Sequence, residues 1–294
     1  MKTSLIMEGG GMRGMFTCGV NDVLLENDIT FDGSAGISAG ACFGCNFKSK
    51  QIGRALRYNL KYGKDPHYGS LRSLIRTGDY YNADFCYRQI PNELDVFDVE
   101  TFAANPMEFY VGATDVETGR IIYHNCKDGG STDIEWMRAS ASMPLVSKIV
   151  EIGRYKLLDG GIVDPVPFRF MERKGFDRNV IILTQPKGYE KKKSSIMPLF
   201  FTLMRDYPKI VQAMNVRHIR YNRQMEEIAE REEKNEVLVI RPPEELKIGR
   251  TEGNPKELQR VYDIGRAEAE KRLEEIRAFL RPDKDQADGK EEGE

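Results

Sequence analysis

GGGMRG at residues 9–14 and GISAG at residues 36–40 are the two stretches that decide the fold. Each follows an apolar run that is typical of a buried strand, and the second places Ser38 in the pattern GxSxG. This pattern is typical of a tight strand-to-helix turn that exposes a serine, because Gly36 and Gly40 lack the Cβ atoms that would clash there. We therefore predict that Ser38 is a nucleophile.

A serine nucleophile needs hydrogen-bond donors aimed at the oxygen that becomes negative when an acyl group is attacked. The loop at residues 9–14 can supply them, because backbone N–H groups in a glycine-rich loop are not obstructed by side chains. GxSxG alone is a weak signal, whereas the two motifs in this order indicate a serine hydrolase.

The composition fits a globular protein of one large domain or two. The chain has 294 residues, 40% of them hydrophobic, with a formal net charge of −2 and a pI near 6.1. This charge argues against a dedicated nucleic-acid binder. No apolar run is long enough to span a bilayer, and the apolar stretch of residues 1–8 is too short for a signal peptide. We therefore expect a cytoplasmic protein.

Strand and helix patterns alternate along the chain, which predicts an α/β fold: three layers, α/β/α, with a mostly parallel central sheet. Helices are expected at residues 15–27, 39–47 and 134–143, and a longer one at 255–280 that only Gly265 interrupts. The strands at 108–113 and 120–123 are close enough to form a hairpin. Strands are expected at residues 3–8, 30–35, 108–113, 120–123, 155–158, 179–183 and 237–240.

The chain divides into a catalytic domain at residues 1–185 with an insertion at 48–91, a helical C-terminal extension at 186–282 that packs on the core, and a charged tail at 283–294 that we expect to be disordered. The insertion and residues 187–223 combine basic side chains with aromatic or apolar ones. An anionic membrane surface selects this combination, although an ordinary solvated helix over a core-packed face gives the same pattern.

No histidine has the sequence neighbours of a catalytic base, and His67, His124 and His218 are more typical of surface positions. A carboxylate can replace histidine if burial raises its pKa. Asp159 follows an apolar strand and precedes two glycines, which predicts a position at the strand's C-terminal end, although Asp-Gly is also common in turns. Asp164, before Pro165, is more typical of a helix N-cap.

The cysteines and the possible metal ligands do not indicate a catalytic role. Five scattered cysteines predict free thiols, and Cys42 with Cys45 is interpreted as helix packing in preference to a redox pair. No cluster of His, Cys and Asp has ligand spacing, so we expect no metal and no cofactor.

The chain resembles the patatin-like phospholipases over roughly residues 3–185. The resemblance is carried by residues 9–14, 36–40 and 159–161, together with RASASMPL at residues 138–145. It implies a Ser-Asp dyad without histidine, with Ser38 as nucleophile and Asp159 as base. It also implies that Gly10, Gly11 and Met12 form the oxyanion hole.

The same resemblance implies that Arg13 braces the loop or holds headgroup charge. Asp164 departs from the family, which commonly has Asn at this position. The extension resembles that of some bacterial relatives and carries little functional information.

Three functional hypotheses remain open. The first is a phospholipase A or lysophospholipase that forms an acyl-enzyme, acts on a lipid or acyl ester, and contacts an anionic membrane peripherally. The second keeps the enzyme class but acts on soluble acyl groups, as a carboxylesterase, thioesterase or transacylase. The third is a non-enzymatic module that binds phosphate at the glycine loop, or an inactive lipid-surface scaffold. The sequence does not indicate an oligomeric state.

Overall fold

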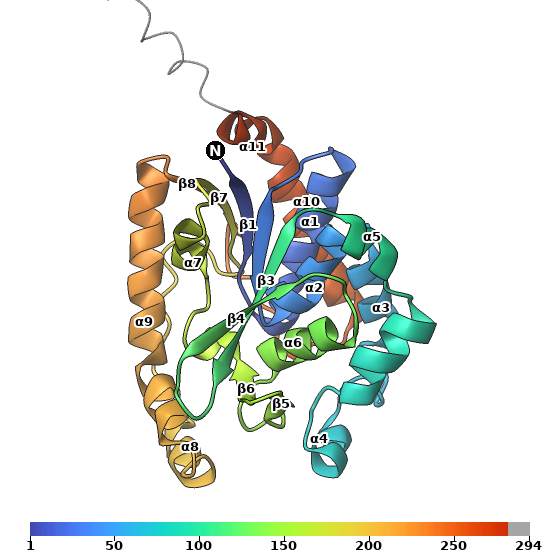
Figure 1. Cartoon of the computed structure of the whole chain (residues 1–294), viewed down its shortest axis with the longest axis vertical. Helices are drawn as coiled ribbons and strands as arrows, with labels where there is room; N and C mark the ends of the chain where they lie inside the picture. The colour runs from blue at the N-terminus through green and yellow to red at the C-terminus, as the bar shows by residue number, and fades with distance from the viewer. Residues whose placement is uncertain (282–294) are drawn as a thin grey trace, which may run out of the picture.

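The computed structural model describes residues 1–281, so the tail predicted for residues 283–294 lies outside the described residues. An eight-stranded sheet forms the centre of the molecule, and helices cover both of its faces (Figure 1). The strands are β1 (Thr3–Met7), β2 (Gly33–Ile37), β3 (Glu108–Asp115), β4 (Ile121–Cys126), β5 (Val150–Ile152), β6 (Tyr155–Asp159), β7 (Arg178–Ile182) and β8 (Val237–Ile240).

The sheet is mostly parallel, as predicted. β3, β2, β1, β7 and β8 lie side by side in that order, each parallel to its neighbours. The predicted hairpin of β3 and β4 is confirmed by their antiparallel pairing. β6 also pairs antiparallel with β3, and β5 with β6. The fold is therefore an α/β fold with a small antiparallel part beside β3.

The helices form the outer layers and much of the C-terminal part. Their bounds are η1 (Gly11–Gly14), α1 (Met15–Glu26), α2 (Ala39–Lys48), α3 (Arg54–Tyr62), α4 (Leu71–Thr77), η2 (Phe85–Leu94), α5 (Val99–Ala104), α6 (Ser131–Ala141), η3 (Gly160–Ile162), α7 (Phe168–Arg173), α8 (Met197–Leu203), α9 (Pro208–Glu233), α10 (Pro255–Lys271) and α11 (Leu273–Leu280). Of these, η1 and η3 are 3₁₀ helices and η2 is a π-helix. No helix within residues 1–281 is both long and apolar enough to cross a bilayer.

Alternating side chains of β1 show how the core is divided. Leu5 and Met7 are fully buried in the cluster shared with α1, α2 and α10, whereas Ile6 is fully buried in the cluster shared with α7 and α9. Successive side chains of a strand point to opposite faces, so an apolar run of this kind requires cover on both sides. Figure 1 shows the corresponding arrangement, with α7 and α9 on one side of the sheet and α1 and α10 on the other.

The C-terminal extension shares the sheet and the core with the first 185 residues. β8 extends the sheet by pairing with β7, so the extension is not purely helical. α10 crosses α1 at very close range, because a Cβ on Gly265 would lie 2.1 Å from the Phe16 carbonyl oxygen. The Tyr262 hydroxyl also donates to Asp22 at 2.7 Å. The helix runs through Gly265 and breaks at Arg272, which corrects the predicted interruption.

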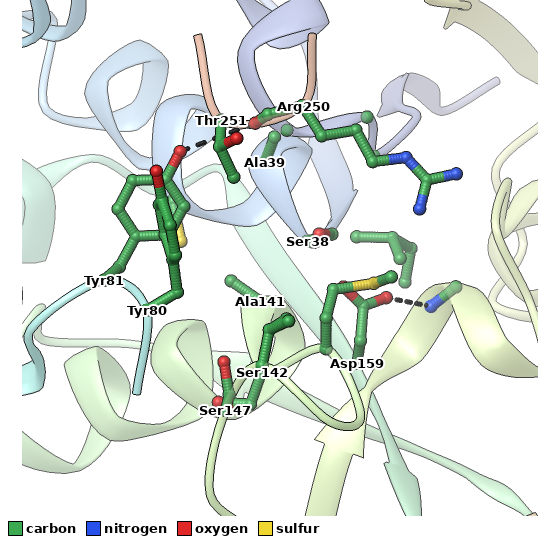
Figure 2. A pocket seen from close by; sticks show the side chains of 18 of the residues that line it. Ser38, Ala39, Tyr80, Tyr81, Ala141, Ser142, Ser147, Asp159, Arg250 and Thr251 are labelled. Atoms are coloured by element: carbon green, nitrogen blue, oxygen red, sulfur yellow. Dashed lines mark hydrogen bonds between the residues drawn. The ribbon is translucent and has the colours of Figure 1, made fainter. Parts of the chain in front are cut away.

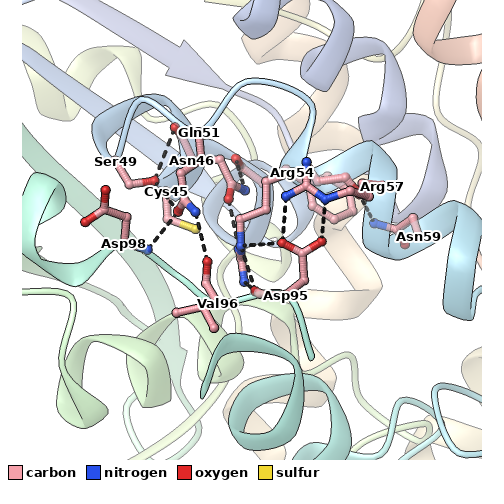
Figure 3. A network of polar contacts seen from close by, with 12 residues as sticks. Cys45, Asn46, Ser49, Gln51, Arg54, Arg57, Asn59, Asp95, Val96 and Asp98 are labelled. Carbon is pink, nitrogen blue, oxygen red and sulfur yellow. Dashed lines mark hydrogen bonds and ion pairs between the residues drawn. The ribbon is translucent and has the colours of Figure 1, made fainter. Parts of the chain in front are cut away.

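A buried arginine braces the insertion against the core (Figure 3). The Arg54 side chain is almost fully buried, donates to Asn46 Oδ1 at 2.9 Å and donates twice to the Asp95 carbonyl oxygen. Asp95 in turn accepts two hydrogen bonds of 2.7 Å from Arg57. The guanidinium thus ties the start of α3 to α2 and to the end of η2.

Candidate active site

Ser38 occupies a strained turn between β2 and α2. Its φ of 56° and ψ of −121° are rare for a residue with a side chain and cost on the order of 1–3 kcal/mol. The turn is possible because its glycines leave room: a Cβ on Gly36 would lie 2.4 Å from the Gly40 carbonyl oxygen, and one on Gly40 2.3 Å from that of Met7. The Ser38 hydroxyl makes no capping hydrogen bond to α2. It interacts with Asp159 instead, because it is one of the groups that lower the pKa of that carboxyl.

Ser140 fixes the backbone of this turn through two hydrogen bonds. Its buried hydroxyl accepts the Ser38 backbone N–H at 2.9 Å and donates to the Gly112 carbonyl oxygen at 2.6 Å. Because Ser140 belongs to α6 and Gly112 to β3, the hydroxyl joins three elements at one point. Ser140 belongs to the family-like segment at residues 138–145, but no sequence pattern indicates this role.

The strand register brings Ser38 and Asp159 together. β4 occupies one edge of β3, so β2 and β6 must both pair with the other edge. β2 ends with Ile37 opposite Gly112, and β6 ends with Asp159 opposite Ala113. The two strands run in opposite directions and meet end to end, so Ser38 and Asp159 occupy adjacent positions at one junction.

Asp159 is 1% exposed and only partly satisfied by hydrogen bonds. Its Oδ1 accepts the Gly161 N–H at 2.7 Å, while Oδ2 is buried without a hydrogen-bond partner. Burial raises the pKa of Asp159, and the Ser38 hydroxyl and the Arg217 charge oppose this rise. The free oxygen can therefore accept a proton, and Figure 2 shows Ser38 and Asp159 at the same pocket.

The glycine loop lies against this pair. A Cβ on Gly9 would lie 2.7 Å from the Ser38 Cβ, so the loop can approach the serine only as glycine. The Met12 N–H donates to the Arg250 carbonyl oxygen at 3.1 Å, and so it is already occupied. The N–H groups of Gly10 and Gly11 form no hydrogen bond within residues 1–281, which leaves them available as donors.

A cavity of about 860 Å³ opens over Ser38 and Asp159. Most of its wall is apolar or aromatic. Around the residues 8–13, 37–45 and 159–165, the insertion, residues 134–147 and the extension supply the rest of the wall. Tyr80 and Tyr81 of the insertion face Arg250 and Thr251 across it, and the Tyr81 hydroxyl donates to the Arg250 carbonyl oxygen at 3.4 Å (Figure 2). The extension thus contributes directly to the site, contrary to the expectation that it carries little functional information.

Comparison with known proteins identifies the family. The family model described as patatin-like phospholipase matches residues 5–171, which is more than half of the chain. This chain belongs to the patatin-like phospholipase family. A second model, described only as a domain of unknown function, matches residues 207–281.

Two curated relatives of this patatin-like protein are similar in sequence. An uncharacterized protein of Escherichia coli, YjjU, is 26% identical over 198 residues, which cover 63% of this chain and 52% of the relative. The lysophospholipase nte1 of Aspergillus niger is 28% identical over 180 residues, which cover 59% of this chain and 11% of the relative. The matches therefore span about half of one relative and about a tenth of the other.

Two solved structures are similar to this chain at low sequence identity. VipD from Legionella pneumophila has a TM-score of 0.45 at 12% identity, covering 93% of this chain and 67% of VipD. The type III effector protein ExoU has a TM-score of 0.38 at 11% identity, covering 95% of this chain and 54% of ExoU.

The histidines of this patatin-like chain take different positions. His67 pairs with Asp65, and His124 pairs with Asp133, whereas His218 of α9 lines the cavity. His218 was expected at the surface, but it lies in the cavity wall.

Asp164 is not the N-cap that the sequence suggested, because α7 begins only at Phe168. The Asp164 carboxylate instead accepts hydrogen bonds from the Tyr123 hydroxyl at 2.5 Å and from Gln224 at 2.9 Å. It therefore links β4 to α9.

One cluster with metal-ligand chemistry lies outside the cavity. Ligand atoms of His124, Cys126 and Asp133 lie within 4.8 Å of one another, a proximity that the sequence did not reveal. Both Asp133 oxygens are already engaged, Oδ1 by His124 and Oδ2 by the N–H groups of Asp128 and Gly129. The His124 ring also stacks on Trp136. We interpret this cluster as structural.

The five cysteines are free, as predicted. Burial raises the pKa of Cys42, the thiol at the cavity wall, to about 12, so it is protonated at neutral pH.

Proposed function

We propose that the protein is a serine acyl hydrolase that cleaves lipid acyl esters with Ser38 and Asp159. One observation carries the proposal: the buried, unpartnered Asp159 Oδ2 belongs to a residue adjacent to Ser38 at the junction of β2 and β6. A buried carboxylate with a raised pKa can take the serine proton, whereas a structural carboxylate would have both oxygens satisfied.

The proposed reaction has two steps. Ser38 Oγ attacks the acyl carbon as its proton moves to Asp159 Oδ2, and this proton then passes to the departing alcohol. Water, deprotonated by Asp159, attacks the acyl-enzyme; the bond between Ser38 Oγ and the acyl carbon then breaks, the proton passes from Asp159 to Oγ, and the acid leaves. The N–H groups of Gly10 and Gly11 would stabilise the oxyanion in both steps, because they are the loop donors that remain unoccupied. Met12 could contribute only if its hydrogen bond to Arg250 opened.

The cavity supports a lipid in preference to a small soluble ester. Its volume of about 860 Å³ and its aromatic wall suit a long acyl chain, which would lie among Tyr58, Tyr68, Ile90 and Met137. The carboxylesterase, thioesterase and transacylase hypotheses share the dyad and differ only in substrate.

Exposed apolar side chains beside the cavity favour delivery from a membrane surface. α4 and α8 lie at the same end of the molecule in Figure 1, and both contribute residues to the cavity wall. Leu71 and Ile75 of α4 are 70% and 85% exposed, and Phe201 and Leu203 of α8 are 57% and 60% exposed. When exposed apolar side chains form a contiguous patch, the patch commonly marks a site of contact with a protein or a membrane. We propose that this end rests on a lipid surface.

The test is covalent labelling with a lipophilic fluorophosphonate, followed by intact-protein mass spectrometry. Wild type should gain a single adduct, Ser38→Ala should gain none, and Asp159→Asn should react more slowly. Ser147→Ala is the matched control, because Ser147 lines the same cavity but lies outside the dyad. An adduct that persists in Ser38→Ala would refute the assignment.

His218→Gln tests the alternative base. The dyad predicts that this variant labels at close to the wild-type rate. Slow labelling of His218→Gln, combined with wild-type labelling of Asp159→Asn, would assign the base to His218 instead.

A further inference from the structure

Seven lysines and arginines line the cavity that contains Ser38 and Asp159, and four of them, from separate segments, act electrostatically on one another. Arg13 comes from η1, Lys191 from the loop after β7, Arg217 from α9, and Arg250 from the loop before α10. Three of the four lie beyond residue 171, where the patatin-like match ends.

These cations lack acidic partners. Within residues 1–281 none of the four forms an ion pair. Arg13 Nε is buried without a hydrogen-bond partner, and Arg217 uses Nε to donate to the Gly161 carbonyl oxygen at 2.7 Å. Lys191 Nζ lies 4.2 Å from the centre of the Tyr221 ring. Most of the donors of these side chains are therefore free to face a ligand.

The cations repel one another across the cavity. Burial, together with the charges of Arg217, Arg250 and Arg13, lowers the pKa of Lys191 to about 7, while Glu8 opposes the shift. The Glu8 carboxylate is already hydrogen-bonded by Tyr221 and Thr184. The groups that face this region are Glu8, Arg13, Asp159, Tyr189, Glu190, Lys191, Lys192, Arg217, His218, Tyr221 and Arg250. Over the whole cavity wall four carboxylates, Glu8, Asp79, Asp159 and Glu190, stand against seven lysines and arginines, so the cavity favours an anionic ligand.

We propose that Arg13, Lys191, Arg217 and Arg250 form a subsite for the phosphate group of an anionic lipid headgroup. The inference rests on the proposed function, because it concerns the substrate of the same site. A phosphate offers several charged oxygens that can face cations from four directions, whereas a carboxylate offers only two in one plane. The acyl chain would then lie toward the insertion and the headgroup toward the extension.

Substrate preference provides the first test. Turnover of monooleoylglycerol phosphate is compared with that of monooleoylglycerol, which has the same acyl chain and no charge. Wild type should prefer the phosphate at least about tenfold in kcat/KM, and Lys191→Met and Arg250→Met should each reduce this ratio about tenfold. Lys191→Arg should retain it. Lys193→Met is the matched control, because Lys193 is exposed and does not line the cavity.

Direct binding provides the second test. Ser38→Ala protein, which cannot turn over substrate, is titrated with glycerol phosphate and with inorganic phosphate in a calorimeter. Binding of glycerol phosphate that weakens in Ser38→Ala combined with Lys191→Met supports the proposal. Binding of inorganic phosphate without any substrate preference would overturn it, because the ligand would then be the free ion. No binding and no preference would also overturn it.

Fluorophosphonate labelling distinguishes a failure of the phosphate subsite from a failure of the proposed hydrolase function. A labelled Ser38 in an enzyme without phosphate preference would refute the subsite and leave the hydrolase assignment intact. An unlabelled Ser38 would refute the hydrolase.

Discussion

Replacing Gly265 by alanine tests whether the extension and the catalytic core fold as one unit. In an ordinary helix this change stabilises by about 1 kcal/mol, because glycine has a lower helix propensity than alanine. At the α1–α10 crossing the new Cβ would lie 2.1 Å from the Phe16 carbonyl oxygen, and real Cβ atoms essentially never approach closer than 3.0 Å. The helices would therefore have to separate by nearly 1 Å.

Separation of this size has an estimable cost. A gap of about 0.5–1 Å forfeits a quarter to a half of the dispersion energy of each contact, and overpacking in cores costs about 1–3 kcal/mol. After subtraction of about 1 kcal/mol for helix propensity, we expect a net loss of up to about 2 kcal/mol in the free energy of unfolding. For a chain of this length each kcal/mol lowers Tm by about 2–4 °C.

Urea denaturation followed by circular dichroism measures the effect. Gly249→Ala is the control, because a Cβ on Gly249 meets no atom within 4 Å and its φ is not positive. It should be neutral or slightly stabilising. A Gly265→Ala protein that is about 1 kcal/mol more stable than wild type, as at an ordinary helix position, would show that the two helices do not cross at this distance.

Four further outcomes are expected. Asp159→Asn should abolish turnover yet raise Tm, since it removes a buried charge whose pKa is raised by burial, and an unchanged or lower Tm would contradict this. In wild type, kcat/KM should fall as pH decreases through the raised pKa of Asp159, because protonation removes the base; a profile that is flat down to the ordinary range of aspartate would be inconsistent. Ser140→Ala should slow Ser38 labelling and cost about 1–3 kcal/mol, because it leaves the Ser38 N–H and the Gly112 carbonyl without their partner, and chemical denaturation measures the loss. Phosphate binding by Ser38→Ala should weaken as pH rises through about 7, the pKa of Lys191, and calorimetry at several pH values would reveal a pH-independent affinity if the lysine is not involved.

The central layer of the fold follows from local patterns. Continuous apolar runs at residues 3–8 and 179–183 predict buried parallel strands, and both are present as β1 and β7. The glycines of GxSxG predict the turn at Ser38, because the need for a missing Cβ is a property of the turn itself. The α/β class and the patatin-like family are confirmed on this basis.

The remaining features of the fold and of the candidate site depend on contacts between segments that are distant in sequence. A local sequence pattern does not contain these contacts. β5 has only three residues and was not predicted, and the antiparallel direction of β6 is set by its pairing with β3. Asp164 has the local sequence of an N-cap but is bound by Tyr123 and Gln224, two residues far away in the chain. Lys191, Arg217 and Arg250 are ordinary basic residues in sequence, and only folding gathers them at one cavity.

β2 and β6 meet end to end on one edge of β3. The proposed reactive residues are therefore held by different parts of the chain from those that shape most of the cavity. The positions of Ser38 and Asp159 are fixed by hydrogen-bonded register with β3, and neither residue depends on the insertion for its place in the sheet. The cavity walls, by contrast, come largely from the insertion and the extension. The walls can therefore diverge in shape and charge while Ser38 and Asp159 keep their spacing, so that the proposed catalytic frame can be adapted to different substrates by changing the segments around it.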